Sequence, residues 1–126
     1  MELITRATAS IGVKSVRFGT AWRHTEPQQG QWNWAPLDRL VNAATQAGME
    51  PQLMLSFGGA EWTKPPESLE RARADNAMNR QWRYPPRPEL WREFVRTVAN
   101  RHRGRVRLRE VWNEPDIGFF QGTTDQ

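Results

Sequence analysis

Residues 106–121 read VRLREVWNEPDIGFFQ and join a predicted strand to a cluster of chemically active side chains. The first seven of these residues, 106–112, are rich in Val, Leu and Trp and predict a β-strand. The strand leads directly into Trp112, Asn113 and Glu114, which Pro115 follows. An aromatic ring, an amide and a carboxylate therefore come together at the C-terminal end of one strand. Glycoside hydrolysis uses these groups as a surface for the sugar ring, a hydroxyl-binding amide and a proton donor.

The residues before this strand predict an alternation of helices and strands. Pro36 and Pro88 suit the first position of a helix, and Gly48 suits a left-handed helix cap. The apolar run Leu53-Met54-Leu55 is typical of a strand buried on both faces of a parallel sheet. Alternation of this kind predicts an α/β fold with right-handed crossovers. Helices are expected over residues 2–10, 36–47 and 88–103, and strands over residues 13–18, 50–57 and 106–112.

Two connections are long. Residues 19–35 predict a loop rich in Trp, Gln and Gly, and residues 58–87 are irregular apart from a short helix over residues 66–74. Connections of this length are often functional. In the first predicted strand, Arg17 lies on the face opposite to Val16 and Phe18.

The composition is that of one globular domain. The chain has 126 residues, of which 37% are hydrophobic and 25% charged, and no apolar run approaches the length of a membrane span. It has no cysteine, and its two histidines are 78 positions apart, so neither a metal site nor a cofactor is predicted. The first residues lack the basic start and apolar core of a signal peptide, and no compartment is assigned.

The net charge of +4 comes mainly from arginine, which supplies 16 of the 18 basic residues. Residues 101–109 hold five arginines and one histidine, a pattern that can contact nucleic-acid phosphates. The alternative is a solvated helix end, because cations interact favourably with the C-terminus of a helix dipole. We favour the helix end and predict no nucleic-acid partner.

Two motifs resemble signatures of clan A glycoside hydrolases. Residues 25–34 (TEPQQGQWNW), followed by Leu37-Asp38, are similar to a clan loop of the form E-P-x-x-G-x-aromatic-x-W that leads into a helix. The stretch Trp112-Asn113-Glu114-Pro115-Asp116 resembles the clan's acid/base motif at the end of barrel strand four. Residues 117–123 (IGFFQGT) and 90–95 (LWREFV) are most similar to family 39, which includes β-xylosidases and α-L-iduronidases.

This resemblance implies a partial (β/α)8 TIM barrel, with strands two to four and their helices. Residues 1–126 would then be an incomplete, truncated catalytic domain of a retaining glycoside hydrolase, because a whole barrel needs about 250 residues. Arg109 stands where the family usually has an aromatic residue. The family's nucleophile, a second Glu at the end of strand seven, has no counterpart here.

The resemblance also assigns roles to individual residues. Glu114 is the expected general acid/base, and Asn113 is expected to donate to a sugar hydroxyl next to the reacting carbon. In the clan, an Arg at the position of Arg17 often pairs with the nucleophile. His24, Trp22 and Trp62 follow strand ends and are candidates for a sugar subsite, or for ordinary loop packing.

Two further carboxylates have mainly structural explanations. Glu26 belongs to the loop motif and is expected to fix the loop through hydrogen bonds. Glu110 is either a carboxylate that supports the active site or an ordinary strand residue paired with an arginine.

Other functions stay open. The expected partner is an oligosaccharide or glycoside, and one alternative is that the chain binds it without cleaving it. Alternatively, unpaired sheet edges could let a half-barrel associate with itself. We expect the isolated chain to be inactive, because one carboxylate cannot perform the two-step retaining mechanism.

Overall fold

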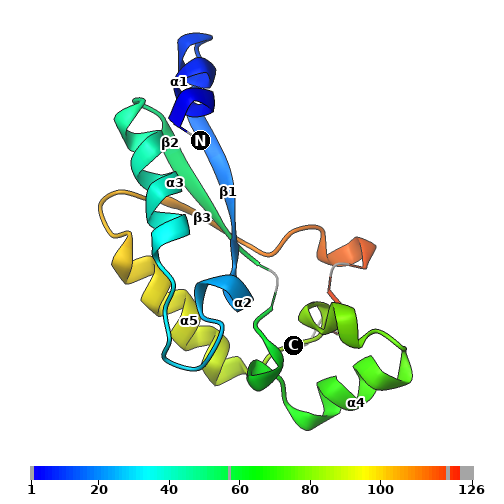
Figure 1. Cartoon of the computed structure of the whole chain (residues 1–126). Coiled ribbons are helices and arrows are strands. Elements are labelled where there is room, and N and C mark those ends of the chain that lie inside the picture. Colours follow the sequence, from blue (N-terminus) through cyan, green and yellow to red (C-terminus); the bar gives the residue numbers. More distant parts are fainter. Residues whose placement is uncertain (1, 57, 119, 123–126) are drawn as a thin grey trace.

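A computed structural model describes residues 2–56, 58–118 and 120–122. Helices and strands alternate along the chain (Figure 1), as the sequence patterns predict. The α-helices are α1 (Glu2–Ser10), the short α2 (Trp22–Thr25), α3 (Ala35–Gln46), α4 (Pro66–Ala74) and α5 (Pro88–Arg101). The strands are β1 (Ser15–Ala21), β2 (Glu50–Ser56) and β3 (Leu108–Val111), and 3-10 turns lie at η1 (Glu61–Thr63), η2 (Met78–Arg83) and η3 (Pro115–Ile117).

The three strands form one open, parallel sheet in the order β1-β2-β3. Phe18 of β1 is level with Leu53 of β2, which is level with Arg109 of β3. The middle strand is the apolar one, and its residues 53–56 are all buried. A parallel α/β arrangement is therefore confirmed, and the register decides which side chains share a face.

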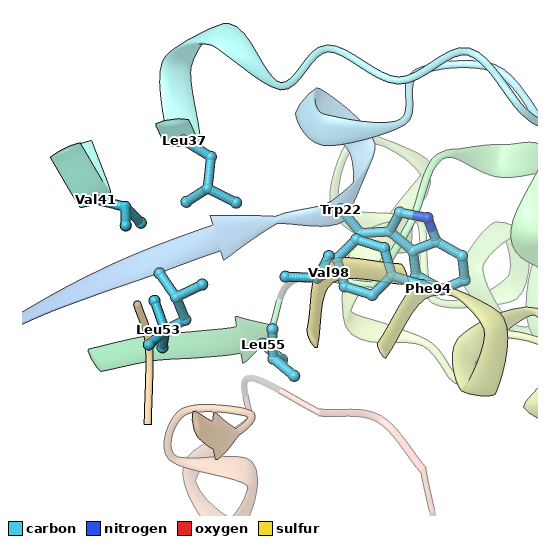
Figure 2. Close-up of a cluster of buried hydrophobic side chains, with 8 residues drawn as sticks. Trp22, Leu37, Val41, Leu53, Leu55, Phe94 and Val98 are labelled. Atoms are coloured by element: carbon cyan, nitrogen blue, oxygen red, sulfur yellow. The ribbon is translucent and has the colours of Figure 1, made fainter. Parts of the chain in front are cut away.

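Helices α3 and α5 pack on one face of this sheet (Figure 1). Figure 2 shows their apolar side chains meeting those of β2, with Phe94 of α5 stacked on Trp22 at a ring-centroid distance of 4.7 Å. The buried core consists of Trp22, Leu37, Val41, Leu53, Leu55, Phe94, Val98 and Val106. Four of these core side chains, Leu37, Val41, Phe94 and Val98, come from α3 and α5, where apolar residues recur at helical spacing.

The first and last strands differ from their predicted limits. β1 runs from Ser15 to Ala21 rather than over residues 13–18, because its ladder with β2 continues to the pair Ala21–Ser56. β3 is shorter than the predicted 106–112. Val106 instead donates its N–H to His102 O and enters the core, and Trp112 leaves the strand with φ at +66°.

The predicted loop over residues 19–35 is also partly regular. Its first three residues complete β1, residues 22–25 form α2, and α3 begins at Ala35, one residue before the expected start. The predicted second strand included Phe57, which lies outside the described residues.

The connection between β2 and α5 is held by its own hydrogen bonds. Tyr84 Oη donates to Asp75 Oδ2 at 2.6 Å, and Ser68 Oγ donates to the Pro85 carbonyl at 2.8 Å. Ala72, Ala77 and Tyr84 form a small buried cluster beneath it. The predicted helix at residues 66–74 is confirmed as α4, and the rest of the segment is ordered by these local contacts.

Candidate active site

The C-terminal ends of the parallel strands lie at one edge of the sheet, where Ala21, Ser56 and Val111 end their strands. Parallel α/β folds and barrels place their active sites at this edge. One face of the sheet carries α3 and α5. Among the described residues, no helix covers the opposite face (Figure 1). Arg17 and Glu110 both lie on this uncovered face.

Arg17 joins the two outer strands. Its Nε donates to Glu110 Oε2 at 2.5 Å and its Nη2 to Glu110 Oε1 at 2.8 Å, while Nη2 also lies 2.9 Å from Met54 Sδ. This pairing lowers the pKa of Glu110, chiefly through the hydrogen bond from Arg17. Of the two explanations for Glu110, pairing with an arginine is therefore observed. The arginine comes from a strand 93 residues earlier.

Asn113 connects Arg17 to Glu114. Its side-chain oxygen Oδ1 accepts a 2.9 Å hydrogen bond from Arg17 Nη2, and its Nδ2 donates to Glu114 Oε2 at 3.1 Å. Glu114 is exposed and Asn113 is half-buried. A continuous line of polar contacts therefore runs from Glu110 through Arg17 and Asn113 to Glu114.

The backbone turns sharply at this point. Trp112 and Glu114 both have positive φ, +66° and +46°, in the left-handed region that residues other than glycine seldom occupy. Such conformations often occur at functional sites. Trp112 is buried between Trp91, at a centroid distance of 6.0 Å, and Phe120, at 5.1 Å. These ring contacts hold the turn that presents Asn113 and Glu114.

Glu26 fixes the loop after α2, as predicted. Its carboxylate is buried and accepts hydrogen bonds from Trp22 Nε1 at 2.8 Å and from Gly30 N at 2.8 Å. Gly30 has φ at +75°, which explains the glycine of the E-P-x-x-G motif. Trp22 itself has no exposed surface and belongs to the core. Its side chain is therefore not available to stack on a sugar, and we leave it out of the proposed site.

His24 and Trp62 lie apart from the Arg17–Asn113–Glu114 contacts. His24 is exposed and its Nε2 accepts from Arg23 Nε at 3.2 Å. Trp62 donates to the Pro27 carbonyl at 3.1 Å and lines a cavity of about 240 Å³. The lining residues are Glu26, Gln29, Gly30, Trp32, Trp62, Leu90 and Glu93. No hydrogen bond or ring contact within the described part of the chain joins either residue to Glu114.

A larger cavity of about 600 Å³ adjoins the Asn113–Glu114 turn. Trp112 and Pro115, on either side of that turn, line it, together with Pro65, Glu67, Ser68, Pro85, Pro86, Pro88, Trp91, Val111 and Phe120. The sequence patterns did not predict this cavity. The paired prolines at 65–66 and 85–86 were visible signals, but nothing in the sequence indicated that they would face Trp112.

Lys64 is a second residue that the sequence analysis did not identify. It is almost completely buried, and its Nζ donates to the Tyr84 carbonyl at 2.7 Å. Burial lowers the pKa of Lys64 from 10.5 to about 7. A Cβ on Gly58 would lie 2.5 Å from Lys64 Nζ and 2.8 Å from the Trp82 backbone oxygen, so this position leaves no room for a side chain.

Comparison with known proteins settles the family. Residues 1–102 match the sequence model of glycoside hydrolase family 42, described as β-galactosidase. This chain belongs to that glycoside hydrolase family. The matched residues include Arg17 and the Glu26 loop, whereas Asn113 and Glu114 lie beyond them. The predicted membership of clan A is confirmed, with family 42 as the family that the sequence model supports.

Individual proteins are also similar to parts of this chain. Endo-1,4-β-xylanase 1 of Gibberella zeae is 29% identical over 93 residues, which span 74% of this chain and 23% of that protein. A family 39 glycoside hydrolase from Bacteroides cellulosilyticus WH2 superimposes with a TM-score of 0.65 at 20% identity, over 91% of this chain and 22% of the other. An apo β-glucosidase, 1317, gives 0.64 at 20% identity, over 93% and 27%.

These superpositions confirm that the family 42 chain has part of a TIM-barrel glycosidase fold. The chain spans about a quarter of the length of each of these proteins. Its assignment to barrel strands two to four, and to an incomplete catalytic domain over residues 1–126, stays a prediction.

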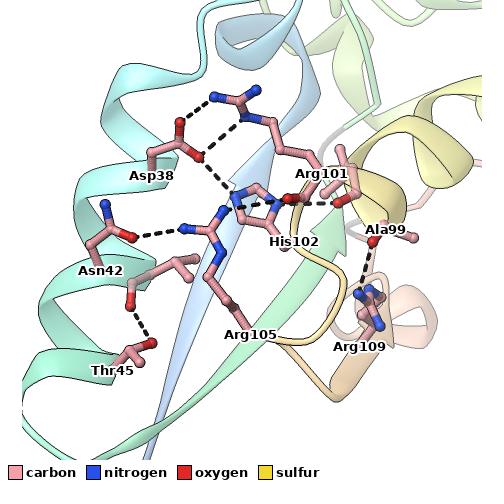
Figure 3. Close-up of polar contacts among 10 residues, drawn as sticks. Asp38, Asn42, Thr45, Ala99, Arg101, His102, Arg105 and Arg109 are labelled. Carbon is pink, nitrogen blue, oxygen red and sulfur yellow. Dashed lines mark hydrogen bonds and ion pairs between the residues drawn. The ribbon is translucent and has the colours of Figure 1, made fainter.

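The basic run at the end of α5 forms contacts within the chain (Figure 3). Arg101 and His102 both bond to Asp38 of α3, and Arg105 Nη1 donates to Asn42 Oδ1 at 2.8 Å. Arg109 donates to the Ala99 carbonyl at 3.1 Å. These bonds join the end of α5 to α3, so part of the basic run connects two helices instead of forming the solvated helix end that was expected.

The described residues offer neither a cluster of metal ligands nor a membrane-spanning helix. No group of three or more His, Cys, Asp or Glu side chains there is arranged to hold a metal ion. No helix in those ranges has the length and apolar character needed to cross a membrane.

Proposed function

We propose that Glu114 is the general acid/base of a retaining glycoside hydrolase and that Asn113 binds the sugar hydroxyl next to the reacting carbon. One observation carries this proposal. The exposed carboxylate of Glu114 and the amide of Asn113 are bonded to each other at 3.1 Å, directly after a parallel strand. Both groups therefore serve one ligand position at the edge where α/β enzymes bind substrates.

The chemistry follows from the two groups. Protonated Glu114 gives its proton to the glycosidic oxygen as the bond to the anomeric carbon breaks. A second carboxylate forms an ester with that carbon. Glu114, now ionised, takes a proton from water, and the water oxygen attacks the anomeric carbon. The ester bond breaks, which releases the sugar and the free second carboxylate. The Asn113 amide donates a hydrogen bond to the neighbouring hydroxyl, a bond that can strengthen in the transition state.

The proposed substrate is a β-glycoside. The family model is described as β-galactosidase, and one relative is an endo-1,4-β-xylanase, so β-galactosides and β-xylosides are the first substrates to test. The second carboxylate belongs, by the resemblance to clan A, to a barrel strand other than the three described here. The two carboxyl groups of a retaining enzyme lie about 5 Å apart.

Binding without cleavage is the second candidate function of these 126 residues. Two other carboxylates near the strand ends, Glu26 and Glu110, are already held by hydrogen bonds to Trp22 and Arg17. Glu26 is buried in its loop and Glu110 bonds to Arg17 on the face of the sheet, and we assign neither of them as the nucleophile. This observation favours a chain that binds a glycoside at Asn113 and Glu114 without turning it over.

A titration followed by nuclear magnetic resonance tests both candidates. Isotope-labelled protein is titrated with methyl β-galactoside and methyl β-xyloside while the Asn113 side-chain amide and the Glu114 carboxyl carbon are observed. We expect saturable shifts at both groups with at least one sugar, and loss of the Glu114 shift in Asn113→Ala. The matched control is Asn100→Ala, on the exposed side of α5. Shifts that are absent in the unmodified chain, or that survive Asn113→Ala, overturn the proposed site.

Hydrolysis of nitrophenyl β-galactoside and β-xyloside by the same protein separates the two candidates. Binding without turnover supports the non-catalytic reading of the isolated chain. Turnover that disappears in Glu114→Gln supports catalysis.

A further inference from the structure

We propose that Glu110 is a positioning residue that acts through Arg17 to hold the Asn113 amide with its NH2 group towards Glu114 and the ligand. The catalytic meaning of this arrangement rests on the proposed function of Glu114. The orientation of the amide can be tested without that function.

A side-chain amide has two chemically different ends. An Asn side chain accepts hydrogen bonds through its oxygen and donates them through its nitrogen, and a 180° rotation exchanges the two. A guanidinium can only donate. Arg17 Nη2 lies 2.9 Å from one of the two terminal atoms of the Asn113 amide. Because the guanidinium donates, that atom has to be the acceptor, the oxygen Oδ1. The NH2 group then faces Glu114, at 3.1 Å.

Arg17 is able to select this orientation because its own position is fixed. Glu110 binds it through two nearly parallel hydrogen bonds, the geometry that orients a planar guanidinium best. Met54 Sδ, at 2.9 Å from Nη2, adds a third contact from the middle strand. Side chains of β2 and β3 therefore hold the guanidinium independently of its bond to Asn113.

Glu110 also supplies the charge that keeps Arg17 away from Glu114. Arg17 is drawn to both carboxylates: its pKa is raised chiefly by the hydrogen bond to Glu110, and the charge of Glu114 adds a smaller contribution. Without Glu110, the nearest carboxylate that could neutralise Arg17 is Glu114 itself. A direct Arg17–Glu114 pair would remove the carboxylate from its ligand and release the amide.

The arrangement defines the ligand group that fits. Asn113 Oδ1 is occupied by Arg17, and one N–H of the amide is occupied by Glu114, so the other N–H is the group left for a ligand. That N–H needs an acceptor, and a protonated amine has no lone pair to offer it. The position therefore accepts a neutral sugar hydroxyl and disfavours the ammonium group of a protonated 2-amino sugar.

The experiment measures how fast the Asn113 side-chain N–H protons exchange with water. In Glu110→Ala we expect exchange to become about fivefold faster, the factor that the loss of one net hydrogen bond gives. The matched control is Glu50→Ala, which breaks the Glu50–Arg107 pair (2.8 Å) at the opposite end of the same sheet and is expected to leave Asn113 unchanged. An unchanged Asn113 exchange rate in folded Glu110→Ala overturns the proposal.

A second variant guards against loss of the fold. Glu110→Gln keeps one acceptor for Arg17 but removes the charge, and its Asn113 exchange rate is expected to lie between those of the unmodified chain and Glu110→Ala. An exchange rate in Glu110→Gln equal to that of the unmodified chain also counts against the proposal, since a charged Glu110 would then not be required.

The ligand arm compares methyl β-galactoside with its 2-amino-2-deoxy analogue at a pH where the amine is protonated. Stronger shifts at Asn113 with the hydroxyl sugar support the proposed selectivity, and equal shifts overturn it. If neither sugar binds, the proposed function of Glu114 fails, while the exchange rates still decide whether Glu110 positions the amide.

Discussion

Arg17 of β1 and Glu110 of β3 form a two-bond ion pair that spans the middle strand of the sheet. The bonds are 2.5 Å and 2.8 Å long, and Met54 of β2 lies beneath them. The two outer strands each pair with β2 and not with each other. The ion pair therefore links the two outer strands directly through their side chains. Arg17 also bonds to Asn113, which in turn bonds to the candidate acid/base Glu114.

The first prediction concerns the pH dependence of this pair. Arg17 lowers the pKa of Glu110 below its ordinary value of 4.5. A lowered pKa means that the pair stabilises the fold above pH 4.5 and that this contribution is lost as the pH falls through the folded-state pKa. A titration of the Glu110 carboxyl carbon should give a midpoint below 4.5, which rises in Arg17→Gln. Identical midpoints in the two proteins would contradict the assignment.

The second prediction concerns Lys64. Burial lowers the pKa of its amine from 10.5 to about 7. Between these values the unfolded chain binds a proton that the folded chain does not, so the free energy of unfolding rises with pH across the window. The rise is at most about 5 kcal/mol. Urea unfolding at the two ends of the window measures it, and Lys64→Met should abolish it.

Lys14 provides the control for this experiment, because it is the other lysine of the chain and is exposed. Lys14→Met should leave the rise with pH intact. If Lys64→Met and the unmodified chain show the same pH dependence, the buried amine is not its source.

The third prediction concerns Phe94, which stacks on Trp22 and packs against Trp91 at 5.6 Å. Its side chain is fully buried, so Phe94→Ala should lower the free energy of unfolding by about 3–5 kcal/mol. Tryptophan fluorescence during urea unfolding follows the transition. Ile11→Ala, at a residue 80% exposed, should change stability by less than about 0.5 kcal/mol. Similar losses in both variants would show that Phe94 is not central to the core.

The fourth prediction concerns the free edge of β3, where Leu108 and Val111 are 51% and 66% exposed. An exposed, apolar edge strand favours pairing with another chain. We therefore propose that the chain associates with itself through β3, and that the double variant Leu108→Lys, Val111→Lys shifts it towards the monomer in sedimentation experiments. Ile11→Lys, which changes an exposed apolar residue away from this edge, should leave the distribution as it is. A purely monomeric unmodified chain would refute the proposal.

Much of the fold could be predicted because it depends on local patterns. The buried run at Leu53-Met54-Leu55 and the helical stripes of α3 and α5 follow directly from the spacing of apolar residues. Glu26 was also placed correctly, because the E-P-x-x-G spacing brings its carboxylate and the Gly30 N–H into one tight loop.

Other features depend on contacts between distant segments. Trp22 was a candidate for a sugar subsite or for ordinary loop packing, but it follows the end of β1 into the helix layer, where Phe94 stacks on it. The burial of Lys64 depends on Gly58 and Tyr84, which come together only after the connection has folded. The alternation of side chains along a strand predicts which face of the sheet carries Arg17. Its bonds to Glu110 and Asn113 required the register of all three strands.

The role of Glu114 can be tested most directly with a reactive sugar. N-bromoacetyl β-galactosylamine carries an alkylating group where an aglycone would lie, and a carboxylate that attacks it displaces bromide and forms an ester. Peptide mass spectrometry of the treated protein then identifies the modified residue. Our account predicts an ester on Glu114 that free galactose suppresses and Glu114→Gln abolishes. Glu61, which is also exposed, serves as the reference for chance reaction. Modification spread evenly over Glu114 and Glu61, with no protection by galactose, would contradict the account.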